Sequence, residues 1–451
     1  MTLDEISNIT GGELICESAN KLSIDAIATD SRKAMPEHLF VALKGESFDA
    51  HDYISQVEQQ GASALVVERA QETKLPQIVV NNSLTALGQI ANFQRKTHAI
   101  PTIALTGSCG KTTTKEMLLS ILSQKGKVHA TQGNFNNEFG VPFTLFNLTE
   151  DDQFSIIELG AGKPGDIDYL SAMVMPDVAL ITTVAEAHIE GMGSLEGVAR
   201  TKGEILNHLI QNGVAVLPKD SQWLSDWKAK LLPEQKLMTF SVTNDADLSA
   251  SNIIRNEQST VFDICHLGKS KTVEMSLMGQ HNISNALAAS AAAIALGASL
   301  DDCAVGLSEV TATAGRLKVL KGLAGSRIID DSYNGNPSSI LAAADVLSEF
   351  SGRKVLILGD MAELGPESKN IHLDLGSKLK SAGIDQVLTV GKLSAYISES
   401  YGGDSLHFNS KQALSSFIET QLNSNFVVLI KGSRSAGMED VVARLVEEKL
   451  C

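Results

Sequence analysis

The sequence predicts an α/β protein of three domains. The chain has 451 residues, too many for one hydrophobic core, which predicts roughly two to four domains. Short apolar runs recur along it and alternate with helical patterns, which is typical of parallel, doubly wound sheets. The composition, with 43% hydrophobic and 20% charged residues, is that of a globular chain with large packed cores.

The first domain is predicted to be a small α/β unit that covers residues 1–82. Short β-rich runs, at residues 39–43 and 64–67, alternate there with polar turns. The Asn-Asn-Ser stretch at residues 81–83 then predicts an exit into a helix, with Ser83 as its N-cap. The domain boundary is therefore placed after residue 82.

The second domain, residues 83–313, is predicted to contain a parallel sheet. An apolar run at residues 100–105 breaks into a glycine-containing loop. A helical pattern follows, with apolar side chains at spacings of three and four: Met117, Leu118, Ile121 and Leu122. Further buried strands are predicted at residues 154–157, 178–181 and 213–217. The alanine-rich residues 285–300 are predicted to form a buried helix that is too short to span a bilayer.

The third domain, residues 314–451, repeats this rhythm and is predicted to be another α/β domain. Its strands are predicted at residues 327–329, 354–358, 386–390 and 426–430. Helical stretches separate these strands, and a helix at residues 441–450 is expected to close the chain. The boundary before this domain falls near residues 312–315.

Charge and cysteine content restrict the partners and the compartment. The net charge of −16 argues against a nucleic-acid surface, which needs clustered lysine and arginine to displace phosphate counterions. The five cysteines are odd in number, scattered and without metal-ligand spacing, so reduced thiols are expected. Residues 1–12 have no apolar run of the kind that a signal peptide needs. We therefore expect a cytoplasmic protein that binds neither nucleic acid nor a membrane.

The loop between the second domain's first strand and helix has the pattern GxxGKTT. Gly107 and Gly110 allow a tight turn whose backbone N–H groups, with the helix dipole, face phosphates. Lys111 is predicted to reach the terminal phosphates, and Thr112 to offer its hydroxyl to Mg²⁺. The predicted nucleotide contacts of this loop are Gly107, Ser108, Cys109, Gly110, Lys111, Thr112 and Thr113. A glycine turn followed by a surface lysine is the alternative, and the loop alone leaves a kinase, a switch protein and a ligase open.

Cys109 lies inside this loop. It is either a small residue tolerated at a variable position or a reactive thiol, since a helix N-terminus and a neighbouring lysine favour the thiolate. On the second hypothesis, alkylation inactivates the protein and Mg-ATP protects it.

At this point the sequence resembles the Mur ligase family, which shares the GxxGKTT loop. The resemblance runs end to end and rests on GNFNNEFGVP at residues 133–142, TTVAEAH at 182–188 and GQHNISN at 279–285, with further short motifs between them. The stretches DDSYNGNP at 330–337, LGDMAELG at 358–365 and KGSRS at 431–435 resemble the branch that adds D-alanyl-D-alanine to a UDP-linked muramoyl tripeptide. The Asp-Asn-Pro-Arg tetrapeptide of the branch that adds the third amino acid is absent.

The resemblance implies an ATP-dependent, amide-bond-forming ligase that acts through an acyl phosphate. Residues 1–82 would bind the UDP substrate, residues 83–313 would bind ATP, and residues 314–451 would form the Rossmann-like C-terminal domain. The implied ligands are ATP, two Mg²⁺ ions, UDP-N-acetylmuramoyl-tripeptide and D-alanyl-D-alanine. A monomer is expected, in which the last domain closes onto the middle one.

The resemblance also implies residue roles. Glu158 would hold Mg²⁺ with Thr112, and His188 would hold a second ion. Lys202 would be carbamylated, or would face the phosphates unmodified. With Lys111, these residues form the implied catalytic set. An ordinary surface glutamate and a structural histidine are the alternatives.

The remaining implied contacts come from all three domains. Asn282 and Asn285 would lie on the adenine side, with Arg316 and Asp331 at the phosphate and ribose. The implied substrate contacts are Ser31, Arg32, Lys44, His51, Asn136, Asn137, Lys431, Ser433 and Arg434. Helix capping, surface ion pairs and loop solubility are the alternatives.

Three rival functions remain at the level of sequence. One is a related ligase that adds a single amino acid or acts on a folate. Another is a guanine-nucleotide switch, although the Asn-Lys-x-Asp base-reading motif is absent. The third is a kinase that transfers phosphate to a hydroxyl group.

Overall fold

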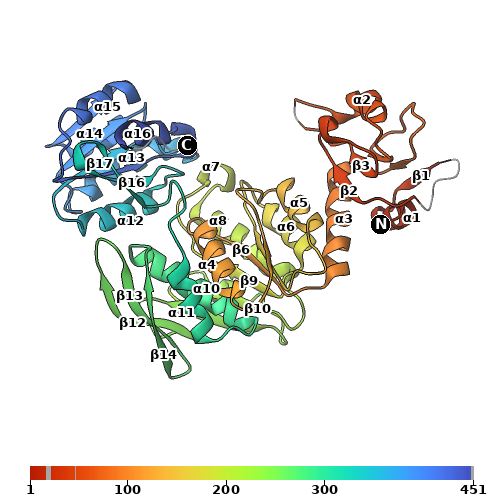
Figure 1. The fold of residues 1–451 in the computed structure, drawn as a ribbon, viewed down its shortest axis with the longest axis horizontal. Helices are drawn as coiled ribbons and strands as arrows, with labels where there is room; N and C mark the ends of the chain where they lie inside the picture. Colours follow the sequence, from red (N-terminus) through yellow and green to blue (C-terminus); the bar gives the residue numbers. More distant parts are fainter. Residues whose placement is uncertain (17–21, 46, 448–451) are drawn as a thin grey trace.

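The computed structural model describes residues 1–16, 22–45 and 47–447. Three sheets follow one another along the chain, and the largest lies between the other two (Figure 1). The prediction of three α/β domains is confirmed. Cys451 and the end of the helix predicted at residues 441–450 lie outside the described residues.

The N-terminal sheet has five strands. Its unit contains α1 (Leu3–Thr10), β1 (Glu13–Ile15), β2 (Ala26–Ala28), β3 (His38–Val41), α2 (Ile54–Gln59), β4 (Ala64–Val67) and β5 (Gln77–Val79). The strand order is β1-β5-β4-β3-β2, and only the β1–β5 pair is antiparallel among these strands. The helix α1 begins at a capping box, in which Thr2 and Glu5 satisfy each other's backbone N–H groups.

The helix α3 (Ser83–His98) joins this unit to the central one. Its N-cap is Asn82, whose side chain accepts a hydrogen bond from the backbone N–H of Thr85 at 2.8 Å. The predicted N-cap, Ser83, is instead the first helical residue. One side of α3 packs into the N-terminal core through Ala86, Leu87 and Ile90. Farther along, Ala91 belongs to a central core, and the Arg95 guanidinium pairs with Asp177 at 3.0 Å.

The central sheet has nine strands in the order β14-β13-β12-β11-β10-β9-β6-β8-β7. Its strands are β6 (Thr102–Thr106), β7 (Val128–Ala130), β8 (Phe154–Glu158), β9 (Val178–Ile181), β10 (Val214–Pro218), β11 (Lys236–Ser241), β12 (Leu248–Arg255), β13 (Thr260–His266) and β14 (Lys269–Met275). The strands from β7 to β12 run parallel, whereas β13 and β14 add an antiparallel extension that the sequence analysis did not predict.

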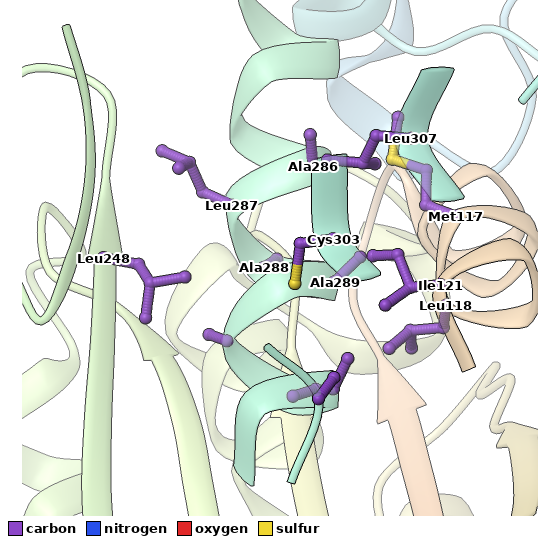
Figure 2. Close-up of a cluster of buried hydrophobic side chains, with 14 of the residues drawn as sticks. Met117, Leu118, Ile121, Leu248, Ala286, Leu287, Ala288, Ala289, Cys303 and Leu307 are labelled. Atoms are coloured by element: carbon purple, nitrogen blue, oxygen red, sulfur yellow. The ribbon is translucent and has the colours of Figure 1, made fainter. Parts of the chain in front are cut away.

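Helices cover both faces of this sheet. They are α4 (Lys111–Ser123), α5 (Gly140–Phe146), α6 (Asp166–Val174), α7 (Ile189–Met192), α8 (Leu195–Lys202), α9 (Leu224–Lys228), α10 (Gln280–Ala295) and α11 (Leu300–Glu309). Figure 2 shows one core, in which Met117 and Ile121 of α4 lie beside alanines of α10 and Leu307 of α11. A Cβ on Gly306 would lie 2.5 Å from the Ile121 Cα, so α11 and α4 pack with backbones in close contact.

The alanine-rich helix does not cover residues 285–300 as predicted. It begins five residues earlier, at Gln280, and ends at Ala295. Gly297, with φ +88°, makes the turn that follows. Ser299 then caps α11 in a capping box with Asp302, so two helices replace the single one.

The C-terminal sheet has six strands in the order β15-β16-β20-β17-β18-β19, with β15 antiparallel at one edge. Its unit contains β15 (Lys318–Lys321), β16 (Arg327–Asp331), α12 (Pro337–Ser348), β17 (Arg353–Leu358), α13 (Ser368–Leu379), β18 (Gln386–Val390), α14 (Ala395–Tyr401), β19 (Ser405–Phe408), α15 (Lys411–Glu419), β20 (Phe426–Lys431) and α16 (Glu439–Leu445). Hydrophobic cores pack against both faces of the sheet. Within the described residues, no helix is long and apolar enough to cross a membrane.

Candidate active site

A cavity of about 980 Å³ lies where the central and C-terminal units meet. The phosphate loop and the start of α10 line it from the central unit, and residues that follow β16 and β17 line it from the C-terminal unit. Carboxyl ends of parallel strands are the usual position of ligand sites in such sheets. The cavity is therefore the candidate active site.

Two glycines of the loop have conformations and surroundings that other residues would not tolerate. Gly107 has φ +151°, and a Cβ there would lie 2.0 Å from the Thr182 hydroxyl oxygen. Gly110 has φ +82°, and a Cβ there would lie 2.3 Å from the Asn285 Oδ1. The backbone of the loop therefore packs directly against Thr182 and Asn285, with no space for a side chain, before α4 begins at Lys111.

Glu158 lies at the base of this loop, at the carboxyl end of β8. Its carboxylate accepts hydrogen bonds from the Thr112 hydroxyl at 3.0 Å and from the Asn136 amide at 2.8 Å. The residue is only 2% exposed and has no ion pair with any lysine or arginine that the structure describes. A buried carboxylate beside a hydroxyl, with its charge uncompensated, is a suitable set of oxygen ligands for Mg²⁺.

Magnesium would need further ligands here. No cluster of three His, Cys, Asp or Glu side chains able to hold a metal occurs among the described residues. Mg²⁺ in nucleotide sites commonly takes one or two carboxylates, with phosphate oxygens and water as its other ligands. Thr112 and Glu158 thus fit an ion that a nucleotide helps to bind.

The C-terminal unit reaches the phosphate loop directly. The Arg316 guanidinium donates to the Thr112 hydroxyl at 3.1 Å, and the Asn336 amide donates to the Cys109 thiol at 3.1 Å. Arg316 also lies 4.3 Å above the centre of the Tyr333 ring. Residues more than 200 positions apart in sequence therefore meet on one side of the cavity.

Asp331 and Lys431 form a buried ion pair on the C-terminal side of the cavity. The Lys431 amine lies 2.6 Å from the Asp331 carboxylate and donates to the Asn334 carbonyl at 2.8 Å. Burial raises the pKa of Asp331, and the positive charge of Lys431 opposes this. Both residues line the cavity, but each already has a partner.

His188 and Glu363 meet across the same interface. His188 follows β9, has φ +56° and contacts the Glu363 carboxylate through its Nδ1. Burial is the largest cause that lowers the pKa of His188, opposed by the Glu363 charge and assisted by Lys202 and Lys111. Both side chains line the cavity.

Lys202 is the last residue of α8 and is 1% exposed. Burial, followed by the charge of Lys111, lowers the pKa of its amine to about 7. No hydrogen bond or ion pair joins the amine to another described residue. Lys202 is therefore a buried amine of which about half is neutral at pH 7, and it lies next to the cavity and not on its lining.

The asparagines predicted at the nucleotide and substrate line the cavity. The Asn282 amide donates to the Met278 carbonyl at 2.8 Å, and the Asn285 amide donates to the Asn282 Oδ1 at 3.1 Å. Asn137 accepts a hydrogen bond from the backbone N–H of Gly140 at 2.9 Å, at the start of α5. These bonds hold the asparagine side chains in place on the cavity lining.

Six predicted substrate contacts do not line this cavity: Ser31, Arg32, Lys44, His51, Ser433 and Arg434. Four of them belong to the N-terminal unit. The imidazole of His51 is buried, with Nδ1 bonded to Asp49 at 2.6 Å and Nε2 accepting from the Glu68 N–H at 2.9 Å. Both ring nitrogens of His51 therefore already have partners within the N-terminal unit.

The other two lie beyond β20. Ser433 bonds to the Ser435 hydroxyl at 3.1 Å, and Arg434 forms an exposed ion pair with Glu439 at 3.1 Å. Arg434 also lies 5.7 Å from the centre of the ring of Tyr333, which lines the cavity.

Tyr333, Asn336 and Glu363 line the cavity, but the sequence analysis assigned them no role. All three lie inside motifs that carried the family resemblance, so the signal was present in the sequence. Their side chains become relevant only when the C-terminal unit packs against the loop, and periodicity and spacing do not encode that packing.

Three family models match the chain. They are the Mur ligase family catalytic domain at residues 23–95, the Mur ligase middle domain at residues 105–293, and the Mur ligase glutamate ligase domain at residues 315–434. Together they cover parts of all three sheets.

Curated relatives agree with these models. The UDP-N-acetylmuramoyl-tripeptide--D-alanyl-D-alanine ligase of Escherichia coli is 42% identical, over 100% of this chain and 99% of its own. The protein of the same name from Bacillus subtilis is 34% identical, over 100% and 99%.

Solved structures extend the comparison to the fold. MurF from Acinetobacter baumannii superposes with a TM-score of 0.92 at 36% identity, covering 99% of both chains. MurF from Thermotoga maritima, solved with ADP, gives 0.85 at 28% identity, covering 92% of this chain and 96% of that one. Folylpolyglutamate synthase of Mycobacterium tuberculosis shares the fold alone, with a TM-score of 0.65 at 15% identity over 80% and 93%. The chain belongs to the Mur ligase family.

Proposed function

We propose that this protein uses ATP to join D-alanyl-D-alanine to UDP-N-acetylmuramoyl-tripeptide, giving the pentapeptide, ADP and phosphate. The proposal rests on a chain of hydrogen bonds from Arg316 through Thr112 to Glu158. It joins an arginine of the C-terminal unit to the phosphate loop and to a buried carboxylate. The names of the full-length relatives supply the substrates. The protein acts as a cytoplasmic monomer.

The loop would hold ATP by its phosphates. Backbone N–H groups of residues 107–113, the Lys111 amine and the Arg316 guanidinium supply positive charge around them. The ADP bound to the Thermotoga maritima relative supports a nucleotide at this position. Asn282 and Asn285 would lie at its adenine side, and Asp331 near its ribose.

Magnesium would be held by Thr112 and Glu158, and a second ion by His188. These ions would neutralise negative charge as phosphate is transferred. The residues of the chain then position the reactants: a carboxylate oxygen of the tripeptide attacks the terminal phosphorus of ATP, and ADP leaves. The neutral amine of the dipeptide next attacks the acyl carbon and forms the C–N bond; the C–O bond to phosphate then breaks, phosphate leaves, and the nitrogen releases one proton.

Lys202 is proposed to be carbamylated. A neutral amine can attack CO₂, forming an N–C bond and releasing one proton, and the low pKa of Lys202 makes a far larger share of its amine neutral near pH 7 than in an ordinary lysine. The anion formed would oppose the positive charge of Lys111. Incorporation of ¹³C from labelled bicarbonate, read by NMR, tests this, and an unlabelled Lys202 would leave the unmodified amine facing the phosphates.

The N-terminal unit is proposed to bind the UDP part of the acceptor. The proposed contacts are Ser31, Arg32, Lys44 and His51, of which the first three have accessible side chains and His51 is buried. Lys431, Ser433 and Arg434 are proposed on the dipeptide side. Asn136 and Asn137 would face the acceptor.

The deciding experiment combines purified protein with Mg-ATP, UDP-muramoyl tripeptide and D-alanyl-D-alanine, and follows ADP release and product mass. The expected result is ADP formation that requires both co-substrates, with a pentapeptide product. A Lys111→Met variant is the matched control and should release no ADP. Turnover with a folate or a single amino acid instead would refute the substrate assignment and keep the ligase mechanism.

A further inference from the structure

Glu363 extends from the C-terminal unit into the cavity. It lies in the loop after β17 and has φ +61°, a left-handed conformation that is unusual for a residue with a side chain. Its carbonyl accepts a hydrogen bond from the Glu190 N–H at 3.3 Å, and its carboxylate contacts His188. The side chain is nevertheless 57% exposed. The loop therefore places a carboxylate at the interface and leaves much of it accessible.

Most other acidic side chains on the cavity are already engaged. Their partners within the described residues are Thr112 and Asn136 for Glu158, Lys431 for Asp331, Lys115 for Glu116, Ser241 and Asn244 for Asp220, and the backbone N–H groups of Gly162 and Lys163 for Asp166. Asp331 and Glu363 are the acidic residues of the C-terminal unit among those that line the cavity. Glu363 is the one of the two that has no lysine or arginine partner.

The incoming dipeptide presents the complementary charge. An α-amino group has a pKa near 8, so most of the dipeptide arrives as an ammonium ion at neutral pH. The cavity contains Lys111 and Arg316, which suit phosphates but repel a cation. An ammonium ion therefore needs a carboxylate close to the reacting carbon, and His188 marks that region under the proposed function.

We propose that Glu363 binds the α-ammonium group of the incoming D-alanyl-D-alanine and so determines where the nucleophile enters the cavity. This inference rests on the proposed function and adds a contact that determines acceptor specificity. Because Glu363 belongs to the C-terminal unit, the dipeptide site is complete only when that unit is docked at His188.

The test is a Glu363→Gln variant, which keeps the size of the side chain and removes its charge. Loss of one charge-assisted hydrogen bond should raise the KM for D-alanyl-D-alanine roughly ten- to hundredfold. The KM values for ATP and the UDP substrate should stay at wild-type levels. Glu367→Gln, which removes a carboxylate from the same loop outside the cavity, is the matched control and should leave all three values unchanged.

A second nucleophile separates binding of the dipeptide from activation of the acceptor. Hydroxylamine is mostly uncharged at pH 7.5 and traps an acyl phosphate as a hydroxamate, so it does not need the Glu363 charge. Hydroxamate formation should therefore proceed equally in wild type and Glu363→Gln. Glu363→Asp, which keeps a carboxylate, should retain most of the affinity for the dipeptide. If the glutamine variant fails to fold, the KM of the aspartate variant for the dipeptide still tests the inference.

The outcomes are distinct. An unchanged KM for the dipeptide in Glu363→Gln, or a full KM increase in Glu363→Asp, would overturn the inference. Loss of hydroxamate formation in Glu363→Gln would also overturn it, because the carboxylate would then act in activation. Wild-type protein that neither ligates the dipeptide nor forms the hydroxamate would refute the proposed function itself.

Discussion

Replacing Lys202 with methionine should stabilise the central unit at low pH and have little effect near pH 10. Lowering the pKa of this amine from its ordinary 10.5 to about 7 corresponds to about 5 kcal/mol of unfavourable free energy for burying the charged form. Below pH 7 the native state carries this full cost. Between pH 7 and 10.5 the unfolded chain binds the additional proton, so the free energy of unfolding rises with pH. Methionine has no charge to bury and removes the whole dependence.

Tryptophan fluorescence can report this effect locally. The two tryptophans of the chain, Trp223 and Trp227, both lie in the central unit. The Trp227 indole N–H donates to the carbonyl of Ala199, on the same helix as Lys202, at 3.1 Å. Urea unfolding of wild type and Lys202→Met at pH 6, 7.5 and 9.5, in buffer free of CO₂, would measure the difference in stability.

We expect Lys202→Met to exceed wild type by up to about 5 kcal/mol at pH 6, with the difference falling towards zero at pH 9.5. Lys269→Met, at an exposed position of β14, is the matched control and should follow wild type at every pH. A difference that is the same at pH 6 and pH 9.5 would refute the reasoning, because it would come from packing and not from charge.

Three further predictions concern the interface and the loop. Glu257→Ala removes a carboxylate of the central unit that binds the C-terminal unit. Docking of the C-terminal unit onto the central unit should therefore weaken roughly fivefold, which corresponds to about 1 kcal/mol. A scattering profile identical to that of wild type, with nucleotide and both substrates present, would contradict this. Alkylation of Cys109 should abolish ligase activity, and bound Mg-ATP should slow the alkylation. Full activity after stoichiometric labelling of Cys109 would disprove the idea. Gly110→Ala should abolish ATP binding in calorimetry, because the methyl group would overlap the Asn285 amide; Gly133→Ala, also left-handed but with open space around it, should bind ATP normally.

The buried parallel strands could be predicted from sequence almost to the residue. Residues 64–67, 178–181 and 386–390 coincide with β4, β9 and β18, because strands buried on both faces read as uninterrupted apolar runs. The antiparallel strand β14 was missed since most of its side chains are exposed and polar. The start of α10 was missed for another reason: Gly279 has no side chain with which to cap it.

The part of the candidate site that lies at the carboxyl edge of the central sheet could be predicted from the sequence. Glu158 is the last residue of β8, and the phosphate loop follows the adjacent parallel strand β6, so their proximity follows from topology. The contact between Arg316 and Thr112 depends on how two units dock, and no local pattern specifies that contact. The burial of His51 shows the same limit, since its Nε2 accepts from the backbone N–H of Glu68, 17 residues away, and no local pattern specifies that contact.

The shared helix α3 has a consequence for substrate length. Because two cores pack along the same 16-residue helix, which is about 24 Å long, the N-terminal and central units are held in a fixed arrangement. Figure 1 shows α3 standing between them. An acceptor anchored at its nucleotide end in the N-terminal unit must place its far carboxylate at the phosphate loop across that fixed span. The helix would therefore determine the length of peptide stem that the protein accepts. A stem one residue shorter or longer would not place its terminal carboxylate where it can react.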